Sequence, residues 1–158
     1  MAVGLEYSGL DELTRAFNKV LDSREGLRRK YHERIADIAK EAVDRNISVT
    51  LNDSHGKIRS WQERIVGSSG GYAAVRPIKG SGKNSPGAIT TYLEEGHRIR
   101  RPSGKAKQKR RRRINVAYVD GRHFYDAARR EVEQKALAVA KEYAEEIANT
   151  LNGGGGSA

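Results

Sequence analysis

Apolar side chains recur every three or four residues near both ends of the chain, and this spacing predicts two long helices. The first is expected from about residue 9 to 45, with Ser8 as its N-cap and a kink or break near Gly26. The second is expected to end at Leu151. The apolar positions of the first helix are Leu10, Leu13, Phe17, Val20, Leu21, Tyr31, Ile35, Ile38, Ala42 and Val43. Those of the second are Ala128, Val132, Ala136, Val139, Tyr143, Ile147 and Leu151.

Between the helices, the sequence favours short strands. Residues 47–51, 57–66, 71–78, 88–95 and 114–119 alternate or are rich in β-branched and aromatic side chains. Glycine and serine at 67–71 and 80–87 indicate turns or loops. Residues 88–95 and 114–119 are predicted to pair as a hairpin with a long tip. We therefore expect an α+β fold: a long N-terminal helix, a small antiparallel sheet with a long basic hairpin loop, and a long C-terminal helix.

Length and composition limit the classes of protein. The 158 residues suit a single domain over 1–151, followed by a flexible glycine-rich tail over 152–158. Cysteine is absent, which excludes disulfides, thiolate metal sites and cysteine nucleophiles. No apolar run approaches the roughly 18 residues that a membrane span needs, and no signal peptide is recognisable. The sequence predicts a soluble protein without a membrane partner.

One window carries the entire charge imbalance. The chain has 30 Lys and Arg against 20 Asp and Glu. Ten basic residues and no acidic residue fall between positions 98 and 113: Arg98, Arg100, Arg101, Lys105, Lys107, Lys109, Arg110, Arg111, Arg112 and Arg113. The remainder is neutral. Such a run is typical of a polyanion contact, a targeting signal or a solvated loop, and the sequence alone leaves all three open.

Candidate chemistry is sparse. The four histidines lack metal-ligand spacing, and we expect neither a metal nor another cofactor. Glu95 and His97 lie two residues apart in a strand-like piece and could share a face as a carboxylate and a general base. A structural pair at a strand end, with a bulge at Gly96, is the favoured interpretation. The glycine-rich stretches do not match a phosphate-binding loop, and Trp61 is expected in the core or at a subunit contact.

Three short motifs resemble the neck and tail-completion proteins of long-tailed bacteriophages. The first comprises Gly56, Ile58, Ser60 and Trp61; the second Tyr92, Glu94, Glu95, Gly96, His97 and Arg98; the third Gly121, Arg122 and Phe124, before the last helix. Residues 9–13 also look like the opening helix of that family. The order of elements agrees over nearly the whole chain, although His55 and the long basic connection depart from the family's pattern.

The resemblance implies a structural virion protein, not an enzyme, that forms a ring at the head-tail junction. A hexamer is favoured over a dodecamer. The implied partners are head-connector and tail proteins. The basic window is expected to contact either packaged DNA or an acidic neighbouring ring, and the sequence leaves the choice between them open. The residues assigned to the sheet and subunit surface are Trp61, Tyr92, Glu95, Gly96, His97, Gly121 and Phe124.

Two other functions remain open from the residues. The basic window suits a free-standing protein that binds nucleic acid without reading its sequence. A small hydrolase using Glu95 and His97 is the third hypothesis, for which no second catalytic group is evident.

Overall fold

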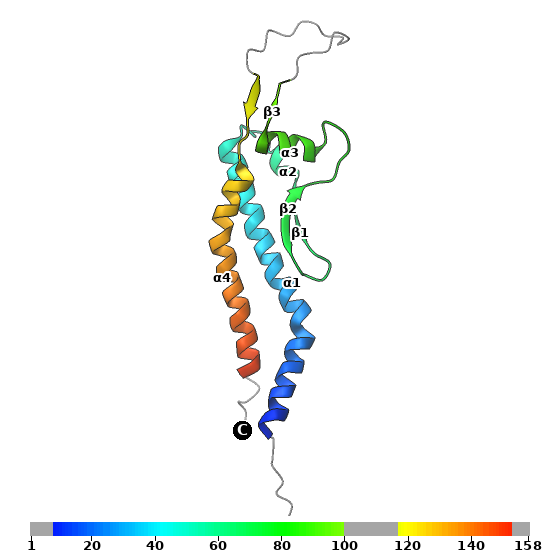
Figure 1. The fold of residues 1–158 in the computed structure, drawn as a ribbon, viewed down its shortest axis with the longest axis vertical. Coiled ribbons are helices and arrows are strands. Elements are labelled where there is room, and N and C mark those ends of the chain that lie inside the picture. The colour runs from blue at the N-terminus through cyan, green and yellow to red at the C-terminus, as the bar shows by residue number, and fades with distance from the viewer. Residues whose placement is uncertain (1–7, 100–116, 153–158) are drawn as a thin grey trace, which may run out of the picture. The chain divides into compact units, whose positions relative to one another are not determined.

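The computed structural model describes residues 8–99 and 117–152 (Figure 1). Its elements are α1 (Ser8–Thr50), α2 (Lys57–Ser60), β1 (Gln62–Val66), β2 (Ala73–Pro77), α3 (Pro86–Glu95), β3 (Gly96–Arg98), β4 (Tyr118–Asp120) and α4 (Phe124–Asn152). Strand β1 pairs with β2, and β3 pairs with β4. The predicted α+β class, with two long helices and small antiparallel sheets, is confirmed. Within the described ranges, no helix is both long and apolar enough to cross a membrane.

The described residues form two compact units. Unit 1 contains residues 8–38, 64–74 and 132–152, and unit 2 contains 39–63, 75–99 and 117–131. The two long helices contribute to both units. The single domain expected over 1–151 stays a prediction. Helix α4 runs through Asn152, one residue into the expected tail, and residues 153–158 lie outside the described part.

In unit 1, α1 lies antiparallel beside α4 (Figure 1). Tyr31 is buried and its ring packs against that of Tyr143, with centroids 5.1 Å apart. The Tyr31 hydroxyl donates to the Glu146 carboxylate at 2.5 Å, and this bond is the main reason that the pKa of Tyr31 rises to about 12. Arg34 pairs with Glu142 one turn away. These contacts set the register of the two helices.

The turn between β1 and β2 is attached to α1 within unit 1. The Arg28 guanidinium donates to the backbone oxygen of Ser69 at 2.6 Å, and Arg64 pairs with Asp37 at 2.9 Å. The glycine and serine residues at 67–71 form the predicted turn, closed by a hydrogen bond from the Gly70 N–H to the Gly67 carbonyl. Helix α1 continues through Gly26, so Gly26 does not split it into two helices.

The strand predicted at 47–51 is wrong, because α1 extends to Thr50. Ile47 is fully buried on the helix's apolar face. The hydroxyls of Ser48 and Thr50 donate to carbonyls four residues back, at 2.8 and 2.7 Å, so these residues satisfy their polar groups inside a helix. Burial of Ile47 outweighs the β-propensity of the sequence.

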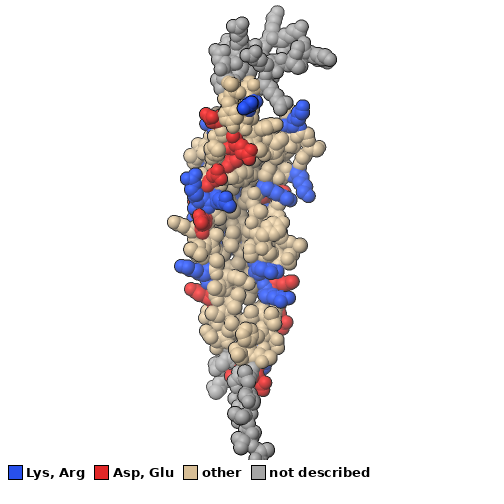
Figure 2. All heavy atoms as spheres, viewed as in Figure 1, with Lys and Arg blue, Asp and Glu red and all other residues tan. Residues whose placement is uncertain are grey.

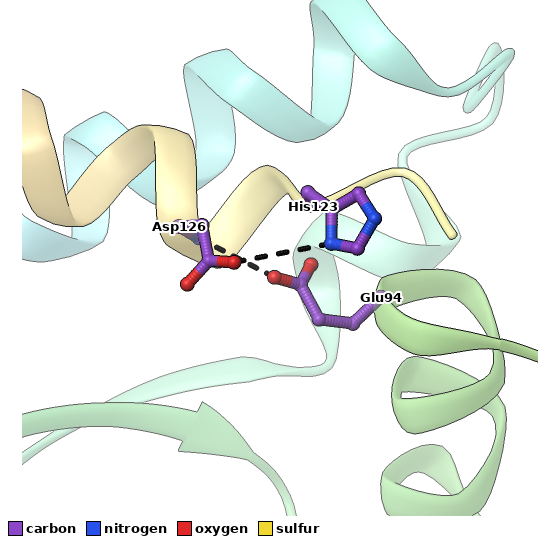
Figure 3. A group of neighbouring side chains, drawn as sticks. All are labelled: Glu94, His123 and Asp126. Carbon is purple, nitrogen blue, oxygen red and sulfur yellow. Dashed lines mark hydrogen bonds and ion pairs between the residues drawn. The ribbon is translucent and has the colours of Figure 1, made fainter. Parts of the chain in front are cut away.

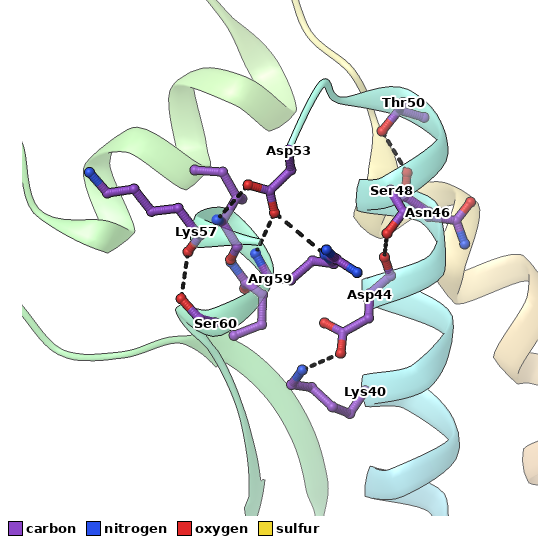
Figure 4. A network of polar contacts seen from close by, with 11 residues as sticks. Lys40, Asp44, Asn46, Ser48, Thr50, Asp53, Lys57, Arg59 and Ser60 are labelled. Atoms are coloured by element: carbon purple, nitrogen blue, oxygen red, sulfur yellow. Dashed lines mark hydrogen bonds and ion pairs between the residues drawn. The ribbon is translucent and has the colours of Figure 1, made fainter. Parts of the chain in front are cut away.

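The first part of the strand predicted at 57–66 is the short helix α2, and only Gln62–Val66 is a strand. Asp53 organises this helix (Figure 4). Its carboxylate accepts from the backbone N–H groups of Ile58 and Arg59 at 3.2 and 3.1 Å, and the Arg59 guanidinium lies 3.5 Å away. Burial by itself would raise the pKa of Asp53. The backbone N–H donors and the Arg59 charge outweigh it, so the net pKa is lowered.

The strand predicted at 88–95 is also wrong, since Pro86–Glu95 is helix α3. Ser85 caps this helix by accepting from the Ala88 N–H at 3.2 Å, and Pro86 occupies the first helical position, where its fixed φ is favourable. These start signals outweigh the β-branched residues that follow. The predicted strand at 71–78 is confirmed as β2, and β4 takes up the end of the strand predicted at 114–119.

We expect Asp53→Ala to lower the free energy of unfolding by about 1–3 kcal/mol, because two backbone donors and a guanidinium lose their acceptor. Asp53→Asn should cost less, since an amide oxygen still accepts a hydrogen bond. The lowered pKa means that the stabilisation is present above about pH 4 and is lost as the pH falls through the folded-state value. Urea unfolding at pH 7 and pH 3 measures both effects. A constant difference between wild type and Asp53→Ala across this range would contradict the assignment.

Candidate functional site

The candidate site is the pair of strands that leads into and out of the basic window. Strands β3 and β4 are antiparallel, with Gly96 opposite Asp120, His97 opposite Val119 and Arg98 opposite Tyr118. The Tyr118 hydroxyl donates to the Glu95 carbonyl at 2.8 Å. We call this ribbon, residues 96–98 with 118–120, the stem. The predicted hairpin therefore exists, but its first strand is 96–98 instead of 88–95.

Two glycines allow the backbones to cross at the base of the stem. A Cβ atom on Gly96, whose φ is 82°, would lie 2.4 Å from the Val119 carbonyl oxygen. A Cβ on Gly121 would lie 2.1 Å from the Glu94 carbonyl oxygen. Neither contact is sterically allowed, so both positions require glycine. The two glycines that the sequence motifs single out thus fix the place where the stem leaves α3 and α4.

Glu94 links the end of α3 to the start of α4 (Figure 3). Its carboxylate accepts from the backbone N–H of Tyr125 at 3.1 Å and of Asp126 at 3.3 Å. The first N–H groups of a helix have no partner within the helix, and a negative charge there is favourable to the helix dipole. A carboxylate from a neighbouring helix therefore acts as the N-terminal cap of α4.

Glu94, His123 and Asp126 are the described residues whose side chains come close enough to hold a metal ion. Their potential ligand atoms lie within 4.8 Å of one another, and His123 is 3.9 Å from Asp126 (Figure 3). Both Glu94 oxygens already accept from the Tyr125 N–H, and the positive end of the helix dipole opposes a cation at this place. This geometry is that of a helix cap, with His123 held at a φ of 50° as the chain enters α4.

A buried polar network lies beneath the stem in unit 2. Gln62 and Thr90 are almost fully buried, and the Gln62 amide donates to the Ile58 carbonyl at 3.1 Å and to the Thr90 hydroxyl at 3.4 Å. The Tyr125 hydroxyl donates to the Gln62 side-chain oxygen. Burial, together with the nearby Glu94 charge, raises the pKa of Tyr125 to about 12. Periodicity could not identify this network, because its members come from three separate elements.

The structure separates the suggested pair of Glu95 and His97. Glu95 is the last residue of α3, whereas His97 is in β3, so they do not share a strand face. The His97 ring packs against Tyr92, with centroids 5.4 Å apart, and its Nδ1 has no hydrogen-bond partner among the described residues. The general-base arrangement considered for these two residues is therefore not formed.

The other predicted surface residues differ in exposure. Phe124 is fully buried at the start of α4 and packs against the Tyr125 ring. Trp61 is half-buried at the end of α2, with the Lys57 ammonium 5.4 Å from its ring. Tyr92 is 47% exposed. Of these aromatic residues, Tyr92 is the most available for contact with another molecule.

Of the basic window, Arg98 is described and is exposed at the end of β3. Arg100, Arg101, Lys105, Lys107, Lys109 and Arg110 to Arg113 lie outside the described residues. Outside the described ranges, the charged residues are these nine basic ones and the acidic Glu6. The described ranges therefore contain 21 basic and 19 acidic residues. Figure 2 shows charges of both signs interspersed on the face in view, with acidic side chains gathered where β4 leads into α4. The described surface is nearly neutral, and the stem joins it to the charged segment.

Comparison with protein-family models, with curated proteins and with solved structures finds no match for this chain.

We expect Gly96→Ala to lower the free energy of unfolding by at least about 3 kcal/mol, because the backbone conformation is strained for any residue with a Cβ and the added atom clashes with main chain. Gly26→Ala is the matched control. Gly26 is in the middle of α1, with nothing within 4 Å of an added Cβ, and the substitution should stabilise by about 0.5–1 kcal/mol. Denaturant unfolding measures both variants, and a neutral effect at Gly96 would refute the close crossing.

Tyr125→Phe should destabilise the protein by about 1–3 kcal/mol at neutral pH, because it leaves the buried Gln62 oxygen without its donor. The raised pKa of Tyr125 means that the hydroxyl's contribution is complete below about pH 10 and is lost as the pH rises towards about 12. The difference between wild type and Tyr125→Phe should therefore shrink over this range. Unfolding curves at pH 8, 10 and 11.5 test this, and a difference that stays constant would contradict it.

Proposed function

We propose that this chain is a structural subunit of a ring at the head-tail junction of a long-tailed bacteriophage, in a neck or tail-completion role, and that its basic window contacts DNA or an acidic neighbouring ring. The observation that carries the proposal is the stem. Strands β3 and β4 leave the α3–α4 corner at a sterically fixed crossing and join the ends of a segment that holds nine basic residues and no acidic residue. A stem that is fixed at the α3–α4 corner and leads into a strongly basic segment suits contact with a polyanion.

The sequence motifs behind the phage resemblance occupy structurally demanding positions. Gly96 and Gly121 form the backbone crossing, Phe124 fills the core beside it, and Glu94 caps α4. Together these residues fix the position of the stem relative to α3 and to the start of α4. This supports a scaffold role for the motifs, as the proposal requires.

Several apolar side chains are also exposed on the described helices. Leu13, Phe17 and Leu21 of α1 are each about half exposed, and Leu137 of α4 is 60% exposed. Surfaces of this kind are typical of proteins that bury them against other subunits. In the described ranges, the polar clusters around the stem act as caps and packing contacts, which supports a structural role over catalysis.

The charge of the basic window makes assembly depend on a partner. A ring of six copies, the number we favour, would bring about 60 positive charges together, and their mutual repulsion opposes closure. DNA or an acidic neighbouring ring would neutralise the charge and so remove this repulsion. The proposal therefore implies that the ring assembles together with a polyanion.

Sequence-independent nucleic-acid binding without a ring is the second candidate function. The same basic window favours it, because Lys and Arg contacts to phosphates need no base recognition. The two functions differ in the mass of the particle: a discrete large ring favours the first, and a monomer on nucleic acid favours the second.

Native mass spectrometry and negative-stain microscopy, with and without duplex DNA, test the proposal. We expect a discrete ring that forms more readily with DNA, and DNA affinity that falls with salt by a log–log slope of about −0.9 for each phosphate neutralised. Replacing Lys105, Lys107, Lys109 and Arg110 to Arg113 by Gln should flatten this slope. As the control, Lys79→Gln with Lys83→Gln changes exposed charges outside the window and should leave it unchanged.

Two results would contradict the proposal. A protein that stays monomeric with DNA and with neighbouring neck proteins is not a ring subunit. Ring formation at low salt without any partner, and unaffected by the Gln substitutions, would refute the coupling of assembly to a polyanion.

A further inference from the structure

Unit 1 carries two separate exposed apolar faces on its two helices. On α1, Leu13, Phe17 and Leu21 are spaced four residues apart and are 46%, 49% and 51% exposed. We call these three residues the α1 stripe. On α4, the face is made of exposed residues spaced three or four apart, which we call the α4 face: Leu137, Ala140, Ala144 and Ala148. Residues with this spacing lie on one side of a helix.

The two faces differ in shape in a complementary way. The α1 stripe presents three large side chains over about 12 Å, given a rise of 1.5 Å per residue, whereas the α4 face presents mainly methyl groups over about 16 Å. Large side chains packed between small ones are the usual form of a close contact between helices. If Phe17 is placed between Ala140 and Ala144 in an antiparallel arrangement, Leu13 falls between Ala144 and Ala148, and Leu21 between Leu137 and Ala140.

Charge complementarity selects this antiparallel direction. Arg24 continues the α1 stripe by one turn, and Glu133 continues the α4 face by one turn; both are exposed. Antiparallel docking brings Arg24 to within about one turn of Glu133, whereas parallel docking moves Arg24 to the opposite end of the α4 face.

We propose that the α1 stripe of one copy docks on the α4 face of a second copy, head to tail. This inference rests on the proposed function, for which it supplies a subunit contact. Within each copy, α1 and α4 are already antiparallel, as the pairs Lys30 with Glu146 and Arg34 with Glu142 require. An antiparallel contact between copies therefore leaves both copies pointing the same way. A head-to-tail contact of this kind can be repeated around a rotation axis to close a ring.

The area is sufficient for the core of such a contact. Three half-exposed side chains of this size leave an apolar patch on the order of 300 Å², as large as the main patch on many monomers. A stable interface buries about 800 Å² on each partner, most of its rim being polar. The exposed charges of Arg24 and Glu133, next to the two faces, belong to such a rim. Figure 2 shows uncharged surface between the charged groups over both long helices.

Two variants and their mixture test the docking. The stripe variant combines Leu13→Ser, Phe17→Ser and Leu21→Ser, and the face variant combines Ala140→Arg and Ala144→Arg. Val49→Ser and Ala138→Arg are the controls, because both positions are exposed and lie away from the two faces. Sedimentation at about 0.5 M salt reports association while the repulsion between basic windows is screened. Circular dichroism checks that each variant folds.

We expect wild type and both controls to associate with rising concentration, and each multiple variant to stay monomeric. Mixing the stripe variant with the face variant should give a one-to-one complex and nothing larger, because each variant retains one intact face. A face variant that still self-associates would show stripe-to-stripe contact and would overturn the proposal. So would a wild type that is monomeric at every concentration, a stripe variant that associates normally, or a mixture without a complex.

The outcomes also separate this inference from the proposed function. If rings form with DNA and the stripe variant forms them equally well, the docking is wrong and the ring proposal stands. If both multiple variants lose association but no condition yields a closed ring, the docking stands and the ring proposal fails.

Discussion

The close crossing of two backbone segments at Gly96 and Gly121 is the constraint on which the candidate site depends. The backbone at Gly96 and at Gly121 can approach the opposite main chain this closely only because neither glycine has a Cβ atom. The carboxylate of Glu94 then reaches the first N–H groups of α4, so one corner both ends α3 and begins the last helix. The stem follows from this corner, since three residue pairs alone make a ribbon too short to be stable in water.

Charge is distributed unevenly between the described residues, which form the scaffold, and the basic segment that joins β3 to β4. The described residues are close to neutral and their ion pairs are largely exposed, so these pairs contribute to register more than to stability. The excess positive charge belongs to residues 100–113, which lie between β3 and β4 in the sequence. Acidic side chains gather where β4 meets α4 (Figure 2). In the proposed function, the basic segment attracts the polyanion and the acidic corner repels it. This separation of charge agrees with the proposed role, in which the neutral scaffold folds and the basic segment meets the partner.

Periodicity predicted the parts of the fold that depend on local pattern. The apolar spacing from Ala128 to Leu151 identified α4, and the pattern up to Val43 identified most of α1. The β-branched residues at 47–51 and 88–95 misled the prediction. In the first case the preceding helix supplied hydrogen-bond acceptors for Ser48 and Thr50; in the second, Ser85 and Pro86 set a helix start that composition obscured. The glycines of the motifs can be recognised in the sequence. The steric need for glycine at these positions cannot, because it comes from a backbone segment more than twenty residues away.

The polar contacts of the site could not be predicted in the same way. Glu94 reaches a helix that begins thirty residues later, and Gln62, Thr90 and Tyr125 meet only after three elements have packed. The exposure of Leu13, Phe17 and Leu21 could not be predicted either. An apolar stripe in the sequence predicts a contact surface, but it does not show whether that surface is buried within the same chain. Long-range pairing, not local propensity, decides each of these features.

The fixed crossing has a consequence for how this protein can change during evolution. The strands enter and leave the basic window through a base that two glycines and one carboxylate hold in place. Lengthening a loop between fixed ends costs only about 0.6 kcal/mol for each doubling of its length. The segment between the strands can thus change in length at little cost while the scaffold keeps its fold, so insertions there need no change in the core.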